Sequence, residues 1–230
     1  GTNVVAGVTP GKGGQTFDAP DGQSVPIFNG MDEAVAATQA NTSVIYVPPA
    51  FAAGAIEEAA DAGVAFIVAI TEGVPVLDMA RAHAFARDRG ARVLGPNCPG
   101  LISPGKAKVG GTGGEVPDLM FRPGPVGIVS RSGGMGAEIS LALTRAGIGQ
   151  STYVAIGGDL LIGAAFVDIL KLFEKDPETK CVVMFGEPGT AREEQAAEFI
   201  ASGGFTKPVV AMIPGELLEN METPATQSHT

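Results

Sequence analysis

The chain has 230 residues, of which 45% are hydrophobic and 17% charged, which predicts a folded protein with one large domain or two modest ones. Its formal net charge of -10 argues against nucleic acid as a partner, because binding to a phosphate backbone needs a basic face. No apolar run reaches membrane-spanning length, and the two distant cysteines, Cys98 and Cys181, form neither a disulfide framework nor a metal-ligand spacing. We therefore expect no membrane, no metal and a cytoplasmic location, or the mitochondrial matrix in a eukaryote.

The first half of the chain alternates short apolar runs with segments of helical periodicity. Strands are predicted at 4–8, 43–47, 65–70 and 92–94, and helices at 31–39, 53–62 and 76–89. This alternation is typical of an α/β fold with a parallel sheet and helices on both faces. Ligands of such sheets bind beyond the carboxyl ends of the strands. The residues at or just past those ends are therefore candidates for one shared site: Lys12, Pro48, Thr71, Glu72 and Asn97.

Lys12 lies between glycines in the segment Pro10-Gly11-Lys12-Gly13-Gly14. A lysine on such a loop is well placed to meet a phosphate, although the glycine spacing is not that of a Walker sequence. A flexible surface loop is the alternative interpretation.

A segment rich in Gly, Pro and Lys, 104–125, is interpreted as the connection between two domains, which we place at 1–121 and 122–230. The alternation then resumes. Strands are predicted at 126–129, 152–156, 181–185 and 208–213, and helices at 137–146, 165–174 and 192–201.

The turn Ser130-Arg131-Ser132-Gly133-Gly134 separates the first of these strands from its helix. Such a turn offers unpaired backbone N–H groups, two hydroxyls and the positive end of a helix dipole, which suit a phosphate. The glycines let an anion approach the backbone closely. A phosphate site and an ordinary strand-to-helix turn are both compatible with this spacing.

Other polar residues allow two interpretations each. Glu187 ends a buried strand in a Gly-Pro turn, where a carboxylate either caps the next helix or orients an imidazole. His83 lies in a predicted helix and is interpreted as structural or solvated, whereas His229, in a polar tail, means little by itself. Cys98 is a reactive thiol or a buried structural one, and Asp159 is a ligand for a cation or hydroxyl or an ordinary turn residue.

Six segments that follow one another along nearly the whole chain resemble one family, the alpha subunits of succinyl-CoA synthetase and related acid:CoA ligases. The segments are Gly7-Val8-Thr9-Pro10-Gly11-Lys12-Gly13-Gly14, Ser43-Val44-Ile45-Tyr46-Val47-Pro48, Ile70-Thr71-Glu72-Gly73, Gly95-Pro96-Asn97-Cys98-Pro99-Gly100, Gly127-Ile128-Val129-Ser130-Arg131-Ser132-Gly133 and Gly149-Gln150-Ser151-Thr152. Because they occur in family order, the resemblance is far more specific than any one motif.

The resemblance implies a Rossmann-like CoA-binding domain followed by a flavodoxin-like ligase domain. It implies an alpha subunit that works with a beta subunit, which binds ATP or GTP with Mg, to form an acyl-CoA from a small carboxylic acid and CoA through a phosphohistidine. Carried over by position, Lys12, Thr71 and Glu72 contact CoA, with Asn97 as a further cofactor-binding candidate. Ser130, Ser132 and Gly133 hold the phosphohistidine, Glu187 orients the imidazole, and His229 is the phosphorylated residue.

Three departures from the family pattern bear on function. The family's first strand and glycine-rich CoA turn have no counterpart here, and the family continues past His229, which predicts that this is part of a longer chain. Ser228 precedes His229 where the family usually has Gly. Gly134-Met135-Gly136-Ala137 replaces the Thr-Leu-Thr-Tyr of the succinate enzymes and is closer to ATP-citrate lyase, so succinate, malate, citrate and a sulfonated analogue all remain candidate acids.

Two functions other than the ligase bear on the same sequence features. A CoA-binding protein or regulator that has lost phosphotransfer is the alternative, because the surroundings of His229 are altered and the CoA turn is missing. A nicotinamide-dependent dehydrogenase is disfavoured, because no dinucleotide fingerprint with its downstream acidic residue is present.

Overall fold

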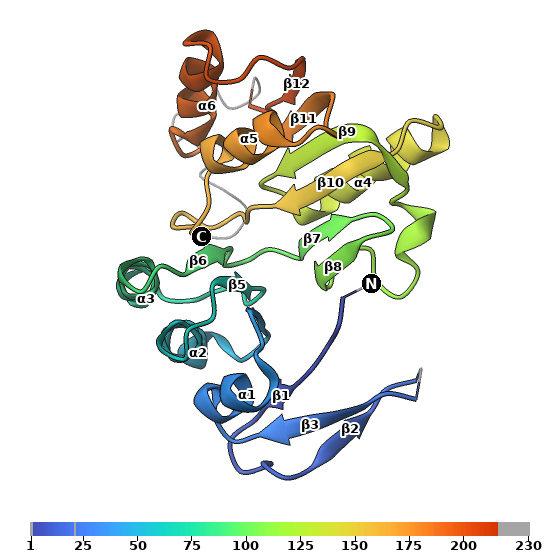
Figure 1. The fold of residues 1–230 in the computed structure, drawn as a ribbon. Coiled ribbons are helices and arrows are strands. Elements are labelled where there is room, and N and C mark those ends of the chain that lie inside the picture. The colour runs from blue at the N-terminus through green and yellow to red at the C-terminus, as the bar shows by residue number, and fades with distance from the viewer. Residues whose placement is uncertain (1, 21, 216–230) are drawn as a thin grey trace.

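The computed structural model describes residues 2–20 and 22–215. Strands and helices alternate along the chain and form stacked units, from the N-terminal sheet at one end to the helix nearest the C-terminal end at the other (Figure 1). The predicted phosphorylated residue, His229, lies outside the described residues. Within the described ranges, no helix is both long enough and apolar enough to cross a lipid bilayer.

The N-terminal half contains two three-stranded sheets and three helices. The first sheet has the order β1 (Gly7–Val8), β3 (Ser24–Phe28), β2 (Thr16–Asp18), and the second is a parallel sheet of β4 (Thr42–Ile45), β5 (Phe66–Ala69) and β6 (Arg92–Leu94). The helices are α1 (Met31–Thr38), α2 (Pro49–Asp61) and α3 (Val76–Asp88). The predicted alternation of strands and helices is confirmed here.

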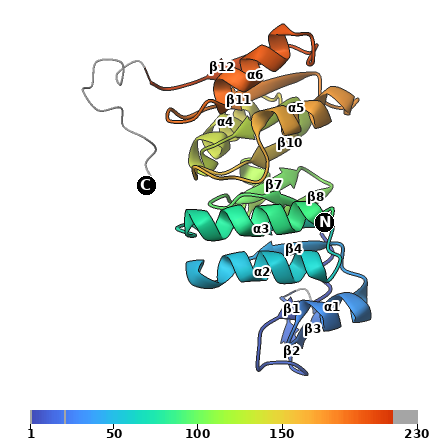
Figure 2. The ribbon, with the colours of Figure 1, turned by 90° about the vertical axis from the view of Figure 1, so that its left-hand side faces the viewer.

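Helices α2 and α3 lie side by side (Figure 2), and most of the buried residues of both helices are alanines. Ala52, Ala59 and Ala82 are fully buried, and Ile56 and Met79 fill the remaining space. Small side chains let two helix backbones approach closely, and the burial of apolar surface stabilises the packing. The helical periodicity of the sequence arises from this buried stripe.

The C-terminal half is built on a six-stranded sheet with the order β12-β11-β9-β10-β7-β8. Its parallel strands are β9 (Pro123–Ser130), β10 (Gln150–Ala155), β11 (Cys181–Phe185) and β12 (Val209–Met212). Helix α4 (Gly133–Arg145) packs on β9 and β10, whereas α5 (Phe166–Lys175) and α6 (Arg192–Ala201) pack together. Right-handed crossovers place α4 on one face of the sheet and α5 and α6 on the other (Figure 1).

A hairpin of β7 (Gly100–Ser103) and β8 (Ala107–Gly110) joins this sheet from the N-terminal side of the chain. β7 pairs antiparallel with β10, so residues that precede the predicted boundary at 121 belong to the six-stranded sheet. The segment 104–125, interpreted from the sequence as a connection, contains β8 and the 3-10 turn Pro117–Leu119. Gly100 has a positive φ of 98° and packs where an added Cβ would lie 2.0 Å from the carbonyl oxygen of Val109, so the hairpin requires glycine at this position. The exact division into domains stays a prediction.

Candidate functional site

A cavity of about 420 Å³ lies at the carboxyl ends of strands from both halves of the chain. The N-terminal half contributes residues after β5 and β6, and the C-terminal half contributes the turn after β9 and the loop after β11. The predicted site residues in its wall are Glu72, Asn97, Ser132, Gly133 and Glu187. The structure therefore brings five of the residues predicted from sequence into one cavity.

The first turn of α4 forms one wall of the cavity. Ser132 is the N-cap, and its hydroxyl oxygen accepts a hydrogen bond from the N–H of Met135. Its carbonyl oxygen accepts from the N–H of Gly136 at 3.1 Å. The first N–H groups of a helix have no partner within the helix, which leaves those of Gly133 and Gly134 at the positive end of its dipole. Both residues line the cavity, so this wall is suited to an anion.

The turn is held in place from beneath by buried hydroxyl groups. Ser130 is fully buried, and its hydroxyl donates to the carbonyl oxygen of Ser132 at 2.6 Å. The phenol of Tyr153, on β10, donates to the carbonyl oxygen of Gly133 at 3.0 Å, and burial raises the pKa of this phenol well above its usual range. Ser130 thus supports the turn and is not part of the cavity wall, although the sequence pattern grouped it with Ser132 and Gly133.

Glycine is needed at two positions in this wall because neighbouring groups approach closely. A Cβ on Gly133 would lie 2.8 Å from Cδ and Cγ of Pro99, which comes from the loop after β6. A Cβ on Gly136 would lie 2.4 Å from the ring of Tyr153. The helix can therefore start against the loop after β6 and over the ring of Tyr153 only with these glycines.

Glu187 follows β11 and also lines the cavity. Its Oε2 atom is buried and has no hydrogen-bond partner within residues 2–20 and 22–215. Buried carboxylate oxygens are normally paired, so an unpaired one in a cavity wall indicates a ligand or another group of the protein as its partner. The interpretation of Glu187 as a helix cap is wrong, because the N-cap of α6 is Ala191 and no side chain makes a capping hydrogen bond there.

The predicted CoA-contacting residues occupy different surroundings. Glu72 and Asn97 line the cavity, and the carbonyl oxygen of Thr71 accepts from the N–H of Asn97 at 2.9 Å. The hydroxyl of Thr71 donates to the carbonyl oxygen of Val47 at 2.7 Å, which ties the ends of β4 and β5 together. Lys12 is exposed on a separate turn and does not line the cavity.

The turn that carries Lys12 is ordered by one asparagine. Oδ1 of Asn29 accepts hydrogen bonds from the N–H groups of Gly11 and Gly13, both at 3.0 Å. These hydrogen bonds hold the loop in a defined conformation, which argues against the flexible-loop interpretation. The Lys12 side chain is exposed to solvent.

Cys98 lines the same cavity but is a poor nucleophile. Burial raises the pKa of its thiol to about 12, and its Sγ donates to the carbonyl oxygen of Ala69 at 3.4 Å. The structural interpretation of this cysteine is thus favoured.

A second, larger hollow of about 810 Å³ lies between α3 and α5. His83 lines it, its Nε2 atom is buried without a partner in the described part of the chain, and burial lowers the pKa of the imidazole. Its walls are mostly apolar and contain none of the predicted site residues that the structure describes.

Sequence reasoning missed two residues that shape the cavity, Arg131 and Tyr153. Arg131 lies within the turn predicted to bind an anion, yet its hydrogen-bond partners come from loops far apart in the sequence. Within the described ranges, no cluster of His, Cys, Asp or Glu side chains is arranged to hold a metal ion.

Comparison with known proteins identifies the class to which this fold and cavity belong. Residues 1–73 match the model of the CoA binding domain, and residues 123–230 match that of the succinyl-CoA ligase like flavodoxin domain. This combination of domains defines an acid:CoA ligase, and it confirms the fold class predicted from the sequence.

Two relatives place the chain more closely. It is 52% identical over 215 residues to succinate–CoA ligase [ADP-forming] subunit alpha 1 of Archaeoglobus fulgidus, which covers 94% of this chain and 70% of the relative. It is 49% identical over 216 residues to the corresponding alpha subunit of Staphylococcus aureus, with 94% and 68% covered. The chain belongs to the family of ADP-forming succinate–CoA ligase alpha subunits, and the designation as alpha subunit implies a partner subunit.

The structure of ATP citrate lyase from Methanothrix soehngenii in complex with citrate and coenzyme A has a similar fold. The TM-score is 0.89 at 28% identity, and the alignment covers 97% of this chain and 38% of the lyase chain. The local similarity to ATP-citrate lyase noted in the sequence thus extends to the fold.

Proposed function

We propose that this chain is the alpha subunit of a nucleotide-dependent acid:CoA ligase that works through a phosphohistidine, together with a beta subunit that binds ATP or GTP with Mg. One observation carries the proposal. A single cavity is lined by Gly133 at an anion-suited helix N-terminus, by Glu187, whose Oε2 atom has no partner among the described residues, and by Glu72 and Asn97 of the N-terminal half.

The reaction divides one difficult step into easier ones. The imidazole of His229 attacks the terminal phosphorus of the nucleotide and releases the nucleoside diphosphate. A carboxylate oxygen of the acid then attacks the same phosphorus and frees the imidazole. The sulfur of CoA finally attacks the carbonyl carbon of the acyl phosphate, phosphate leaves, and the acyl-CoA is formed.

The described residues supply binding and orientation for these steps. The N–H groups of Gly133 and Gly134 hold the phosphoryl oxygens at the positive end of α4. The carboxylate of Glu187 accepts a hydrogen bond from the N–H of one imidazole nitrogen, so that the other nitrogen is free to carry the phosphoryl group. Ser132 caps the helix and keeps its first turn rigid.

The residues of the N-terminal half are suited to CoA, which supplies the thiol of the last step. Lys12 offers a cation to a phosphate group on a turn fixed by Asn29. Glu72 and Asn97 offer polar groups to an amide-containing chain where the cavity opens between the two halves. Thr71 holds the backbone that places Asn97.

The acid is expected to bind beside the small residues of α4. Gly134 and Ala137 line the cavity, and Ala137 stands where the succinate enzymes carry a tyrosine. The shorter side chain leaves room for an acid bulkier than succinate, so the choice between succinate, malate and citrate depends on this stretch and on the partner subunit.

The test is phosphorylation of the full-length protein, purified with its partner subunit, by labelled ATP or GTP. Acid-labile label in the wild type that is lost in His229→Ala would support the ligase, and a screen of succinate, malate, citrate and a sulfonated acid would follow. Absence of label while CoA still binds would overturn the phosphotransfer and leave the CoA-binding protein or regulator.

A further inference from the structure

Arg131, which lines the cavity, forms a buried ion pair with Glu193 on α6. Nη1 of Arg131 lies 3.5 Å from Oε1 of Glu193, and the two side chains are 0% and 6% exposed. A buried ion pair contributes little net stability, because desolvation of both charges offsets their attraction. The functional importance of the pair therefore lies in the groups to which it is hydrogen-bonded.

The pair holds the backbone of Glu187 on both sides of its Cα atom. Nη1 of Arg131 donates to the carbonyl oxygen of Glu187 at 2.9 Å, and Oε1 of Glu193 accepts from the N–H of Glu187 at 2.9 Å. Thr190 links the two again, since its hydroxyl oxygen accepts from Arg131 at 3.2 Å and its hydroxyl donates to Glu193 at 3.3 Å. Nη2 of Arg131 also donates to the carbonyl oxygen of Gly158, at 3.1 Å.

These contacts fix the backbone of Glu187 and with it the direction of its Cα–Cβ bond. Both peptide groups next to its Cα are held by buried charged groups, whose hydrogen bonds are the stronger kind. Oε2 of its carboxylate, in contrast, is buried without a partner among the described residues. The backbone of Glu187 is thus held on both sides, while Oε2 of its carboxylate can accept a hydrogen bond from a further group.

We propose that Arg131 and Glu193 are positioning residues for Glu187. They hold its carboxylate toward the cavity before the imidazole of His229 arrives, so that little reorganisation is needed in the transfer step. The guanidinium also offsets part of the negative charge that Glu187 and a phosphoryl group bring together. The inference rests on the proposed function, because it takes the imidazole as the partner of Glu187.

The first test compares three variants of the full chain with its partner subunit. Glu193→Ala removes the acceptor for the Glu187 N–H, Glu193→Gln keeps an oxygen there, and Glu194→Ala changes the exposed neighbour on the same helix. We expect Glu193→Ala to slow labelling by labelled ATP or GTP about 10-fold or more, since small misplacements of a catalytic group have large effects on rate. Glu193→Gln should stay within about threefold of the wild type, Glu194→Ala should match it, and CoA affinity should change less than about twofold in all three.

The second test is a double-mutant cycle with Glu187→Ala. If Glu193 acts through Glu187, Glu193→Ala causes no further loss of labelling in the Glu187→Ala background. Equal fold losses in both backgrounds would show a merely structural role and overturn the proposal. If Glu193→Ala does not fold, the same double-mutant cycle is measured with Arg131→Lys in its place. This variant keeps the positive charge but lacks the planar guanidinium that donates several hydrogen bonds at once.

The two proposals fail in different ways. A wild type that takes no label overturns the ligase function and the positioning role with it. A wild type that is labelled, with Glu193→Ala labelled equally fast, overturns the positioning role alone.

Discussion

The side-chain amide of Asn97 donates a 2.8 Å hydrogen bond to Oδ1 of Asp159 and so joins the loop after β6 to the loop after β10. The N–H of Gly158 adds a second link, to the carbonyl oxygen of Asn97 at 3.3 Å. Asn97 has a positive φ of 53°, a conformation that asparagine adopts more readily than most residues. The two halves of the chain are thus connected beside the cavity by one side chain whose backbone is in an uncommon conformation.

Replacement of Asp159 is expected to weaken CoA binding. Asp159→Ala removes the acceptor of the Asn97 amide and lets the loop after β6 move, and one lost hydrogen bond to a charged group corresponds to about a 10-fold loss of affinity. Calorimetric titration with CoA measures the change. Asp159→Asn keeps an oxygen acceptor and should stay closer to the wild type. Unchanged affinity in Asp159→Ala would contradict the coupling of the two loops.

Gly136→Ala is expected to destabilise the fold through Tyr153. The added Cβ would lie 2.4 Å from the fully buried ring, and such overpacking lowers the free energy of unfolding by about 1–3 kcal/mol. Urea unfolding measures the loss. Gly134→Ala, where no atom lies within 4 Å of the new Cβ, is the matched control and should change stability by about 0.5 kcal/mol or less. In a Tyr153→Leu background the penalty of Gly136→Ala should shrink, and an equal penalty would argue against the contact with the ring.

Cys98 is expected to be inert in the folded chain. Because burial raises the pKa of its thiol to about 12, only about one thiol in ten thousand is ionised at pH 8. In a Cys181→Ser variant, reaction with Ellman's reagent should be slow in buffer and fast in guanidinium chloride. Fast reaction of the folded variant would mean that the loop after β6 opens readily.

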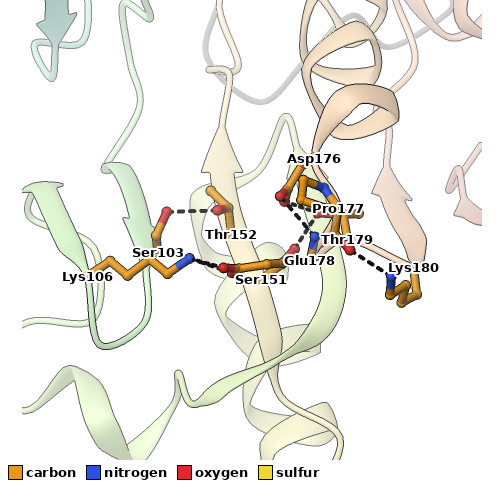
Figure 3. Close-up of polar contacts among 9 residues, drawn as sticks. All are labelled: Ser103, Lys106, Ser151, Thr152, Asp176, Pro177, Glu178, Thr179 and Lys180. Carbon is orange, nitrogen blue, oxygen red and sulfur yellow. Dashed lines mark hydrogen bonds and ion pairs between the residues drawn. The ribbon is translucent and has the colours of Figure 1, made fainter.

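A network of hydroxyl groups at the opposite end of the six-stranded sheet is expected to make stability depend on pH (Figure 3). Thr179, which is fully buried, donates to Oδ2 of Asp176 at 2.6 Å and lies 2.6 Å from the hydroxyl of Ser151. Partial burial raises the pKa of the Asp176 carboxyl, but hydrogen bonds from Thr179 and Glu178 and the nearby lysines outweigh it, so that the pKa is lowered. The contact therefore stabilises the fold above the ordinary carboxyl pKa of about 4 and is lost as the pH falls through the lower pKa of the folded chain.

Thr179→Val tests this network. At pH 7 the variant should lose about 1–2 kcal/mol in free energy of unfolding, and its difference from the wild type should narrow at acidic pH. Lys106→Met is the comparison variant, because it breaks the exposed Lys106–Glu178 ion pair drawn in the same view and removes one of the lysines near Asp176, but keeps the hydrogen bond from Thr179 to Asp176. Exposed ion pairs contribute about 0.5 kcal/mol or less, so its loss of stability should be smaller than that of Thr179→Val. If Thr179→Val lowers the free energy of unfolding by the same amount at every pH, the Asp176 carboxyl is not the cause of the pH dependence.

Local sequence patterns predicted the helices and the parallel strands β4, β5, β6, β9, β10, β11 and β12, because these elements have buried apolar residues at regular spacing. They predicted no strand at β3, and of the strand predicted at 4–8 the structure has only β1. The apolar run at Cys181–Phe185 and the periodic stripe of α2 are signals of that kind. The β7–β8 hairpin lacks such a run, and β7 pairs with a strand about 50 residues further on, which no local pattern encodes. The sequence therefore predicts no strand at 100–103, and the residues of β8 fall within the segment 104–125 that is interpreted as a connection.

The candidate site was predicted in outline but not in the direction of its side chains. Spacing placed Ser130, Ser132 and Gly133 at one turn, yet it could not tell that the Ser130 hydroxyl turns inward to the carbonyl oxygen of Ser132. Arg131 was passed over because its hydrogen-bond partners come from the loops after β10 and β11. Such convergence is a property of the tertiary fold and has no local signature in the sequence.

The antiparallel pairing of β7 with β10 limits how this protein can be divided or recombined. A fragment cut at residue 122 would lose β7 and β8 and leave the backbone of β10 as an open sheet edge, which invites aggregation. A chimaera that borrows the flavodoxin-like half for another ligase should therefore include residues 100–110, even though they precede that half in the chain.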